Sequence, residues 1–107
     1  MVKLASIDLG SNSTRLLIAE LNNQEFNVLH RIHVVTKMSE NLDQTGEISS
    51  ASVKRVYSAL RTFKKLIIKN NVDEVFVIGT AALRDSKNAD DLIENIRKKF
   101  DFEIDVL

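Results

Sequence analysis

The chain has 107 residues, of which 44% are hydrophobic and 28% charged, so we expect one packed domain rather than a disordered chain. Its 15 basic and 15 acidic residues cancel, so net charge does not indicate a nucleic-acid partner, although a local anion site is compatible with it. Cysteine is absent, no apolar run approaches the ~20 residues of a membrane span, and no signal peptide is recognisable. We therefore expect a cytoplasmic protein without membrane contacts.

The first feature along the chain is a pair of apolar strands, residues 3–9 and 15–21, joined by a polar turn. Glycine at position 10 can take backbone angles that other residues avoid, and consecutive N–H groups in a turn of small residues can cradle an anion. A polar turn without a ligand is the simpler interpretation of this spacing alone. The residues of interest here are one carboxylate, one glycine, two small polar residues and one arginine: Asp8, Gly10, Ser11, Asn12 and Arg15.

A third strand and a long helix follow. Residues 26–34 alternate between apolar and polar side chains, with Leu29 as the exception, which is typical of an edge strand with one solvated face. Residues 36–49 form a polar connection. From residue 50 to residue 69 the apolar residues recur with helical periodicity, and Ser49 or Ser50 can cap the start of this helix.

The last part of the chain alternates strand and helix. Residues 75–78 are wholly apolar and predict a buried parallel strand; the apolar run in the second strand likewise predicts a strand covered on both faces, within an antiparallel meander of the first three strands. A loop over 79–87 leads into a second helix that ends near residue 100, with Asn88 as its expected cap. Residues 102–106 alternate and predict a final strand with a partly exposed face.

These elements predict an α/β fold with a five-stranded mixed sheet in the order 3-2-1-4-5 and two helices. The three most apolar strands, the second, first and fourth, belong in the centre, and the alternating strands belong at the edges. Helical crossovers are almost always right-handed, but we leave open whether the two helices lie on the same face of the sheet.

Ligands in such sheets bind beyond the carboxyl ends of parallel strands, where Asp8, Arg15, Thr80 and Arg84 should converge. Guanidinium groups bind phosphate oxygens in pairs, hydroxyl groups can donate to them, and a carboxylate at this position would hold Mg²⁺ or another divalent cation. The structural alternative is that Arg15 pairs with Asp8, and Arg84 with Asp85. Because Asp8 is a ready partner for Arg15, Arg84 is the stronger candidate for phosphate binding.

His30 and His33 lie on opposite faces of a regular strand, so they cannot form a two-histidine metal site and we interpret both as structural.

Two motifs carry a resemblance to a known family. Residues 7–16 (IDLGSNSTRL) resemble the opening signature of the exopolyphosphatase / guanosine pentaphosphate phosphatase family, which lies within the actin-like ATPase superfamily. Residues 79–88 (GTAALRDSKN) are similar to the family's T-(S/A)-A-L-R-x-A-x-N segment. The connection over 36–49 departs from the family pattern, since Lys37, Met38, Ser39 and Asn41 stand where Arg, Leu, Gly and Gly are usual. A plain surface connection is as good an interpretation of it as a ligand-binding loop.

The resemblance implies a ribonuclease H-like half-domain and a parent enzyme that hydrolyses the terminal phosphate of inorganic polyphosphate or guanosine pentaphosphate. It also implies Mg²⁺ dependence and a homodimeric parent that binds neither nucleic acid nor membrane. It assigns phosphate binding to Gly10, Ser11, Asn12, Arg15, Thr80 and Arg84, and metal binding to Asp8.

The resemblance also implies that the family's catalytic glutamate and second phosphate loop follow the fifth strand. We therefore expect residues 1–107 to be a single N-terminal phosphate-binding domain, truncated before the second lobe, with no catalytic residue and no activity of its own. Two alternatives remain: a non-catalytic module that binds polyphosphate or an alarmone, and half of another actin-like phosphotransferase such as a sugar kinase or a chaperone ATPase.

Overall fold

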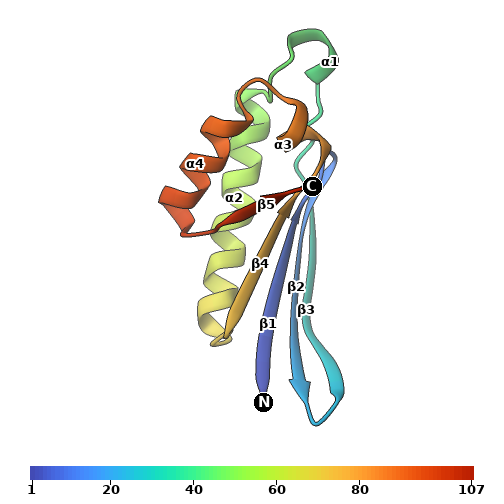
Figure 1. Cartoon of the computed structure of the whole chain (residues 1–107), viewed down its shortest axis with the longest axis vertical. Coiled ribbons are helices and arrows are strands. Elements are labelled where there is room, and N and C mark those ends of the chain that lie inside the picture. The colour runs from blue at the N-terminus through green and yellow to red at the C-terminus, as the bar shows by residue number, and fades with distance from the viewer.

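The computed structural model describes all 107 residues and contains one five-stranded mixed sheet (Figure 1). Its strand order is β3-β2-β1-β4-β5, so the predicted order is confirmed. β1 pairs antiparallel with β2 and parallel with β4; β2–β3 is antiparallel and β4–β5 is parallel. The elements are β1 (Val2–Leu9), β2 (Ser13–Asn22), β3 (Glu25–Val35), α1 (Leu42–Thr45), α2 (Ser50–Lys69), β4 (Glu74–Gly79), α3 (Ala81–Asp85), α4 (Ala89–Phe100) and β5 (Ile104–Val106).

The interrupted alternation at Leu29 has a structural cause. In the pairing of β2 with β3, Ile18 lies opposite His30 and Ala19 opposite Val28, so Leu29 is an extra residue in a β-bulge. The extra residue shifts the phase of the alternation, so that beyond the bulge Ile32 lies opposite Leu16 and His33 opposite Arg15. Arg31 and His33, two residues apart, share one face of β3.

Both long helices pack on the same face of the sheet, as Figure 1 shows for α2 and α4. The handedness rule accounts for this arrangement. The crossovers β3–α2–β4 and β4–α4–β5 both move in the same direction across the sheet, so two right-handed crossovers must put their helices on one side. The core lies between this face and the helices, and its largest fully buried side chains include Phe63, Ile7, Leu9, Leu16, Ile18, Leu60 and Ile96.

The opposite face of the sheet carries no helix. Phe76 in β4 is 50% exposed there, and Ser6 and Asp8 in β1 are exposed on the same side. We expected the apolar runs in β2 and β4 to be covered on both faces, and this is wrong for the present chain. A continuous apolar run indicates a strand that is shielded from water on both faces, but within residues 1–107 only one face of the sheet is covered.

Two short helices replace stretches that we expected to be irregular, α1 in the connection over 36–49 and α3 in the loop over 79–87. The cap expected for α2 is confirmed, because the Ser49 side chain accepts a hydrogen bond from the Ser52 N–H. The cap bond expected from Asn88 is absent. The Asn88 side chain instead accepts from the Ile48 N–H and donates to the Ile48 carbonyl, both at 2.9 Å, and so ties α4 to the segment before α2.

Candidate functional site

The two sequence motifs meet at the carboxyl edge of β1 and β4. Leu9 and Gly79 are parallel neighbours in the register, and the Thr80 N–H donates to the Leu9 carbonyl at 3.3 Å. Across the same edge, the Ala82 N–H at the start of α3 donates to the Ser11 hydroxyl oxygen at 3.3 Å. Segments 71 residues apart in the sequence are thus joined directly.

The turn between β1 and β2 depends on glycine at position 10. Its N–H donates to the Ser13 carbonyl at 3.0 Å, which closes the turn. A Cβ atom on Gly10 would lie 2.9 Å from that same carbonyl oxygen, a separation that real Cβ atoms do not adopt. The backbone approaches so closely here that only a residue without a side chain fits.

Two backbone N–H groups of the turn are free. Ser11 and Asn12 lie between the strands, and their N–H groups donate to no acceptor in the protein. Their carbonyl groups, by contrast, are engaged: Ser11 accepts from the Ser39 N–H at 3.0 Å, and Asn12 accepts from the N–H groups of Thr36 and Lys37 at 3.1 and 3.0 Å. The loop after β3 therefore holds the turn in place by donating hydrogen bonds to the turn carbonyls. The two N–H groups of the turn remain available to an anion.

The two hydroxyl groups differ in what they can offer a ligand. The Ser11 oxygen accepts from Ala82, so its proton is available for donation. The Thr80 hydroxyl lies 3.5 Å from the Leu9 carbonyl as a donor, which is a long hydrogen bond. Of the two predicted donors, Ser11 is the one whose proton has no partner in the protein.

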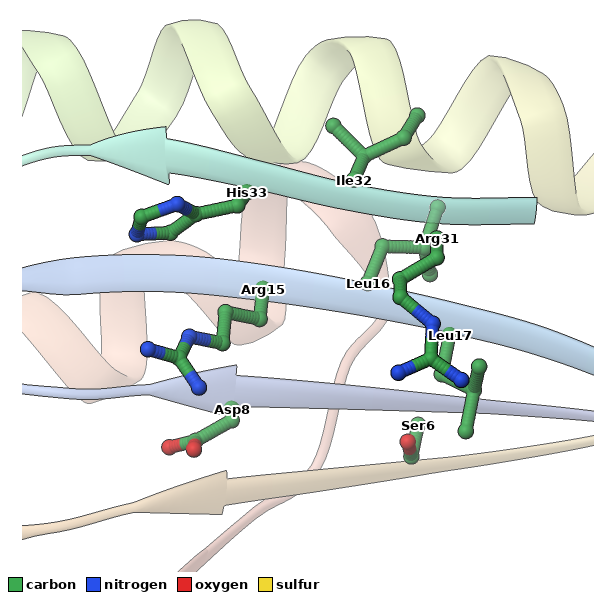
Figure 2. A pocket seen from close by; sticks show the side chains of 8 residues that line it. All are labelled: Ser6, Asp8, Arg15, Leu16, Leu17, Arg31, Ile32 and His33. Carbon is green, nitrogen blue, oxygen red and sulfur yellow. The ribbon is translucent and has the colours of Figure 1, made fainter.

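The two arginines differ in whether they have an acidic partner. We expected Arg15 to be the more readily paired of the two, but it is Arg84 that forms an ion pair. Arg84 binds Asp85 through two hydrogen bonds of 2.9 and 3.1 Å and also donates to the Leu107 carbonyl at 3.3 Å. These hydrogen bonds lower the pKa of the Asp85 carboxyl group. The exposed Arg15 takes part in none of the ion pairs of the structure. Figure 2 shows its guanidinium group directed over β1 toward Asp8.

Asp8 is the only carboxylate among the residues that line the cavity at this edge. It faces Arg15 across the β1–β2 ladder, is exposed, and forms no ion pair. No group of three His, Cys, Asp or Glu side chains lies close enough together to hold a metal ion. A single unengaged carboxylate suits Mg²⁺, which is commonly held by one or two carboxylates together with water and phosphate oxygens.

The structure adds three residues that the sequence reasoning did not assign to the site. A cavity of about 340 Å³ on the helix-free face contains Ser6, Arg31 and His33 beside Asp8 and Arg15 (Figure 2). The register sets His33 opposite Arg15 and Arg31 opposite Leu17. The alternation along residues 26–34 already indicated that these two β3 side chains share the solvated face of the strand, but not that this face lies beside Asp8 and Arg15.

Comparison with known proteins places this geometry in a family. A sequence model of the Ppx/GppA phosphatase family matches residues 17–107. The chain belongs to this family. It is 30% identical over 105 residues to a putative exopolyphosphatase of Haemophilus influenzae, covering 98% of this chain and 32% of that protein. It is 31% identical over 94 residues to exopolyphosphatase 2 of Mycobacterium tuberculosis, covering 84% and 30%.

Solved structures of the Ppx/GppA family have the same fold. The crystal structure of the Aquifex aeolicus family member superposes with a TM-score of 0.96 at 27% identity, covering 99% of this chain and 35% of that chain. The chain thus spans about a third of the length of the Ppx/GppA proteins it matches. None of its helices is both long and apolar enough to cross a membrane. Family membership favours a phosphatase over the alternative of half a kinase or chaperone ATPase.

Proposed function

We propose that residues 1–107 are the phosphate-binding part of a phosphatase that removes the terminal phosphate from inorganic polyphosphate or guanosine pentaphosphate. The observation that carries this proposal is the pair of free N–H groups at Ser11 and Asn12, beside an arginine without an acidic partner. Backbone amides held in a fixed orientation bind an anion without having to reorganise. The relatives named exopolyphosphatases support this substrate class.

The proposed site acts by fixing and neutralising a phosphate group. The two turn amides and the Ser11 proton supply neutral donors, while Arg15 supplies a charge that persists at all physiological pH values. Phosphoryl transfer depends chiefly on positioning and on such electrostatic stabilisation. Gly10 contributes by permitting the close turn, and Thr80 by joining the end of β4 to the end of β1 through its N–H.

Asp8 would hold Mg²⁺, directly or through water. When bound, the ion would neutralise phosphate charge that the Asp8 carboxylate would otherwise repel. The exposure of Asp8 and its lack of an ion pair support this role. The proposal also retains a cytoplasmic location and a homodimeric parent, which rest on the family resemblance alone.

The chain alone should bind phosphate without hydrolysing its esters or anhydrides. Asp8 is the only carboxylate lining the cavity at the site, and it is assigned to the metal, so no carboxylate remains there to activate water. Purified chain mixed with polyphosphate and Mg²⁺ should therefore release no orthophosphate in a colorimetric assay. Release of orthophosphate that Asp8→Asn abolishes would contradict this expectation.

Substitution of Arg15 tests the binding site itself. Arg15→Gln should weaken binding of tripolyphosphate about tenfold, measured by isothermal titration calorimetry, because a charge-assisted contact is lost. The matched control is Arg61→Gln, which removes the same charge from an exposed position on α2. Thermal unfolding should be the same for both variants and the wild type. A lowered melting temperature with unchanged binding would assign Arg15 to the fold instead.

A further inference from the structure

Arg55, near the start of α2, is bound to the loop that supports the turn between β1 and β2. Its Nε atom donates to the Thr36 carbonyl at 3.0 Å, and its Nη2 atom donates to the Ser52 hydroxyl oxygen at 2.9 Å. Nη2 also lies 3.5 Å from a carboxylate oxygen of Glu40, so the guanidinium group has a charged partner in the same loop. The proposed phosphate site assigns no role to this arginine.

The hydroxyl group of Ser52 extends the contact by one residue. It is buried, accepts from Arg55 and from the Ser49 hydroxyl, and donates to the Lys37 carbonyl at 2.7 Å. A hydroxyl group has one proton and two lone pairs, so all hydrogen-bonding positions of this oxygen are occupied. Arg55 therefore holds the carbonyl of Thr36 directly and that of Lys37 through Ser52.

The same two loop residues hold the turn. The N–H groups of Thr36 and Lys37 both donate to the Asn12 carbonyl, at 3.1 and 3.0 Å. The Thr36 carbonyl and the Lys37 N–H belong to a single peptide group, which is planar. Arg55 thus binds one end of the peptide group whose other end holds the turn. A cation at the carbonyl oxygen also polarises this peptide group and strengthens its N–H as a donor.

Lys37 has a strained backbone conformation that depends on these contacts. Its φ of 51° lies in the left-handed region, which a residue other than glycine rarely adopts. Such a conformation persists only where the surrounding structure fixes it. Here the N–H of Lys37 is held by Asn12 and its carbonyl by Ser52. If the contacts around Arg55 are lost, Lys37 can relax, and its N–H and carbonyl no longer keep both partners.

We infer that Arg55 is a positioning residue for the phosphate site. It fixes the peptide group between Thr36 and Lys37, and this group holds the Asn12 carbonyl. The turn thereby keeps the free N–H groups of Ser11 and Asn12 in the orientation that binds phosphate. The inference rests on the proposed function. Arg55 acts through the loop, since the hydrogen bonds of its guanidinium group go to groups of the protein.

The test compares each variant with a reference of equal net charge. Arg55→Gln is compared with Arg61→Gln, which removes the same charge from an exposed position on the same helix, and Arg55→Lys is compared with the wild type. Binding of tripolyphosphate is measured by isothermal titration calorimetry, well below the melting temperature of every variant. Each Arg55 variant should bind about fivefold more weakly than its reference, as for a residue coupled to a site through a contact network. Lysine keeps the charge but lacks the planar fork that reaches two acceptors at once.

Hydrogen exchange gives a second readout that needs no ligand. The Lys37 N–H donates to Asn12 in the wild type and should therefore be protected from exchange with deuterium. Both substitutions of Arg55 should raise its exchange rate by about tenfold, while the amides of β1 and β4 keep their wild-type rates. If Arg55 only stabilised the fold, the exchange rates of the strand amides would rise as well. Arg55→Lys keeps the test available if Arg55→Gln folds poorly.

Each contrary outcome has its own meaning. Equal affinities for Arg55→Gln and Arg61→Gln, with binding by the wild type intact, would refute the role of Arg55 and leave the proposed function standing. Wild-type affinity in Arg55→Lys would show that only the charge matters and would refute positioning. Unchanged exchange at Lys37 would show that the loop does not depend on Arg55. No binding of tripolyphosphate to the wild type would refute the proposed function, and with it the role of Arg55 at that site.

Discussion

Replacing Gly10 by alanine should damage both the stability of the domain and its phosphate site. The new Cβ would lie 2.9 Å from the Ser13 carbonyl oxygen, which belongs to the backbone and cannot move aside as a flexible side chain would. Relief of this contact must lengthen the hydrogen bond of 3.0 Å between the Gly10 N–H and that carbonyl. The cause of the effect is therefore local and geometrically defined.

The size of the effect follows from two contributions. Overpacking of this kind costs about 1–3 kcal/mol, and a weakened backbone hydrogen bond costs about 0.5–1.5 kcal/mol. A net destabilisation of about 2 kcal/mol corresponds to a decrease in melting temperature of roughly 10 °C for a domain of this size. Thermal unfolding followed by far-ultraviolet circular dichroism measures it directly.

The matched control is Asn12→Ala in the same turn. The Asn12 side chain is exposed and makes no hydrogen bond within the protein, while its backbone groups are unaffected by the substitution. Asn12→Ala should therefore keep the wild-type melting temperature and the tripolyphosphate affinity, whereas Gly10→Ala should lose both. An unchanged melting temperature for Gly10→Ala would refute the close-approach argument. Lost binding in Asn12→Ala would mean that Asn12 acts through its side chain rather than its N–H group.

Two further predictions concern residues whose partners differ from expectation. Asp85→Asn releases Arg84 from its ion pair and should strengthen tripolyphosphate binding by about threefold more than the control Asp90→Asn, measured by calorimetry; equal gains would show only an effect of net charge. Asn88→Ala leaves the partly buried N–H and carbonyl of Ile48, in the segment before α2, without their partner and should lower the free energy of unfolding by about 1 kcal/mol in urea titration, whereas Asn95→Ala on the exposed side of α4 should not.

The fold was predictable because its determinants are periodic and local. Alternation separated edge strands from central ones, and helical spacing marked α2 and α4. The handedness rule also implied that both helices share a face, once the strand order was known. The bulge at Leu29 was visible as a break in alternation, but its meaning required the register with β2.

The site was predictable as a location rather than as a set of contacts. The carboxyl-edge rule brought Asp8, Arg15 and Thr80 together correctly. Whether Arg15 or Arg84 has an acidic partner depends on side-chain directions over a few ångströms, and spacing along the sequence does not encode them. The same holds for the loop after β3, whose N–H groups bind the turn carbonyls although its sequence departs from the family pattern.

The central claim is that the turn between β1 and β2 presents the free N–H groups of Ser11 and Asn12 to a phosphate. It is tested most directly by titrating the ¹⁵N-labelled chain with tripolyphosphate and following the backbone amide resonances. The amides of Ser11 and Asn12 should show the largest saturable shifts, and sodium chloride at matched ionic strength should leave these resonances in place. Shifts confined to the lysine-rich end of α2, at Lys64, Lys65 and Lys69, with no change at the turn, would contradict it.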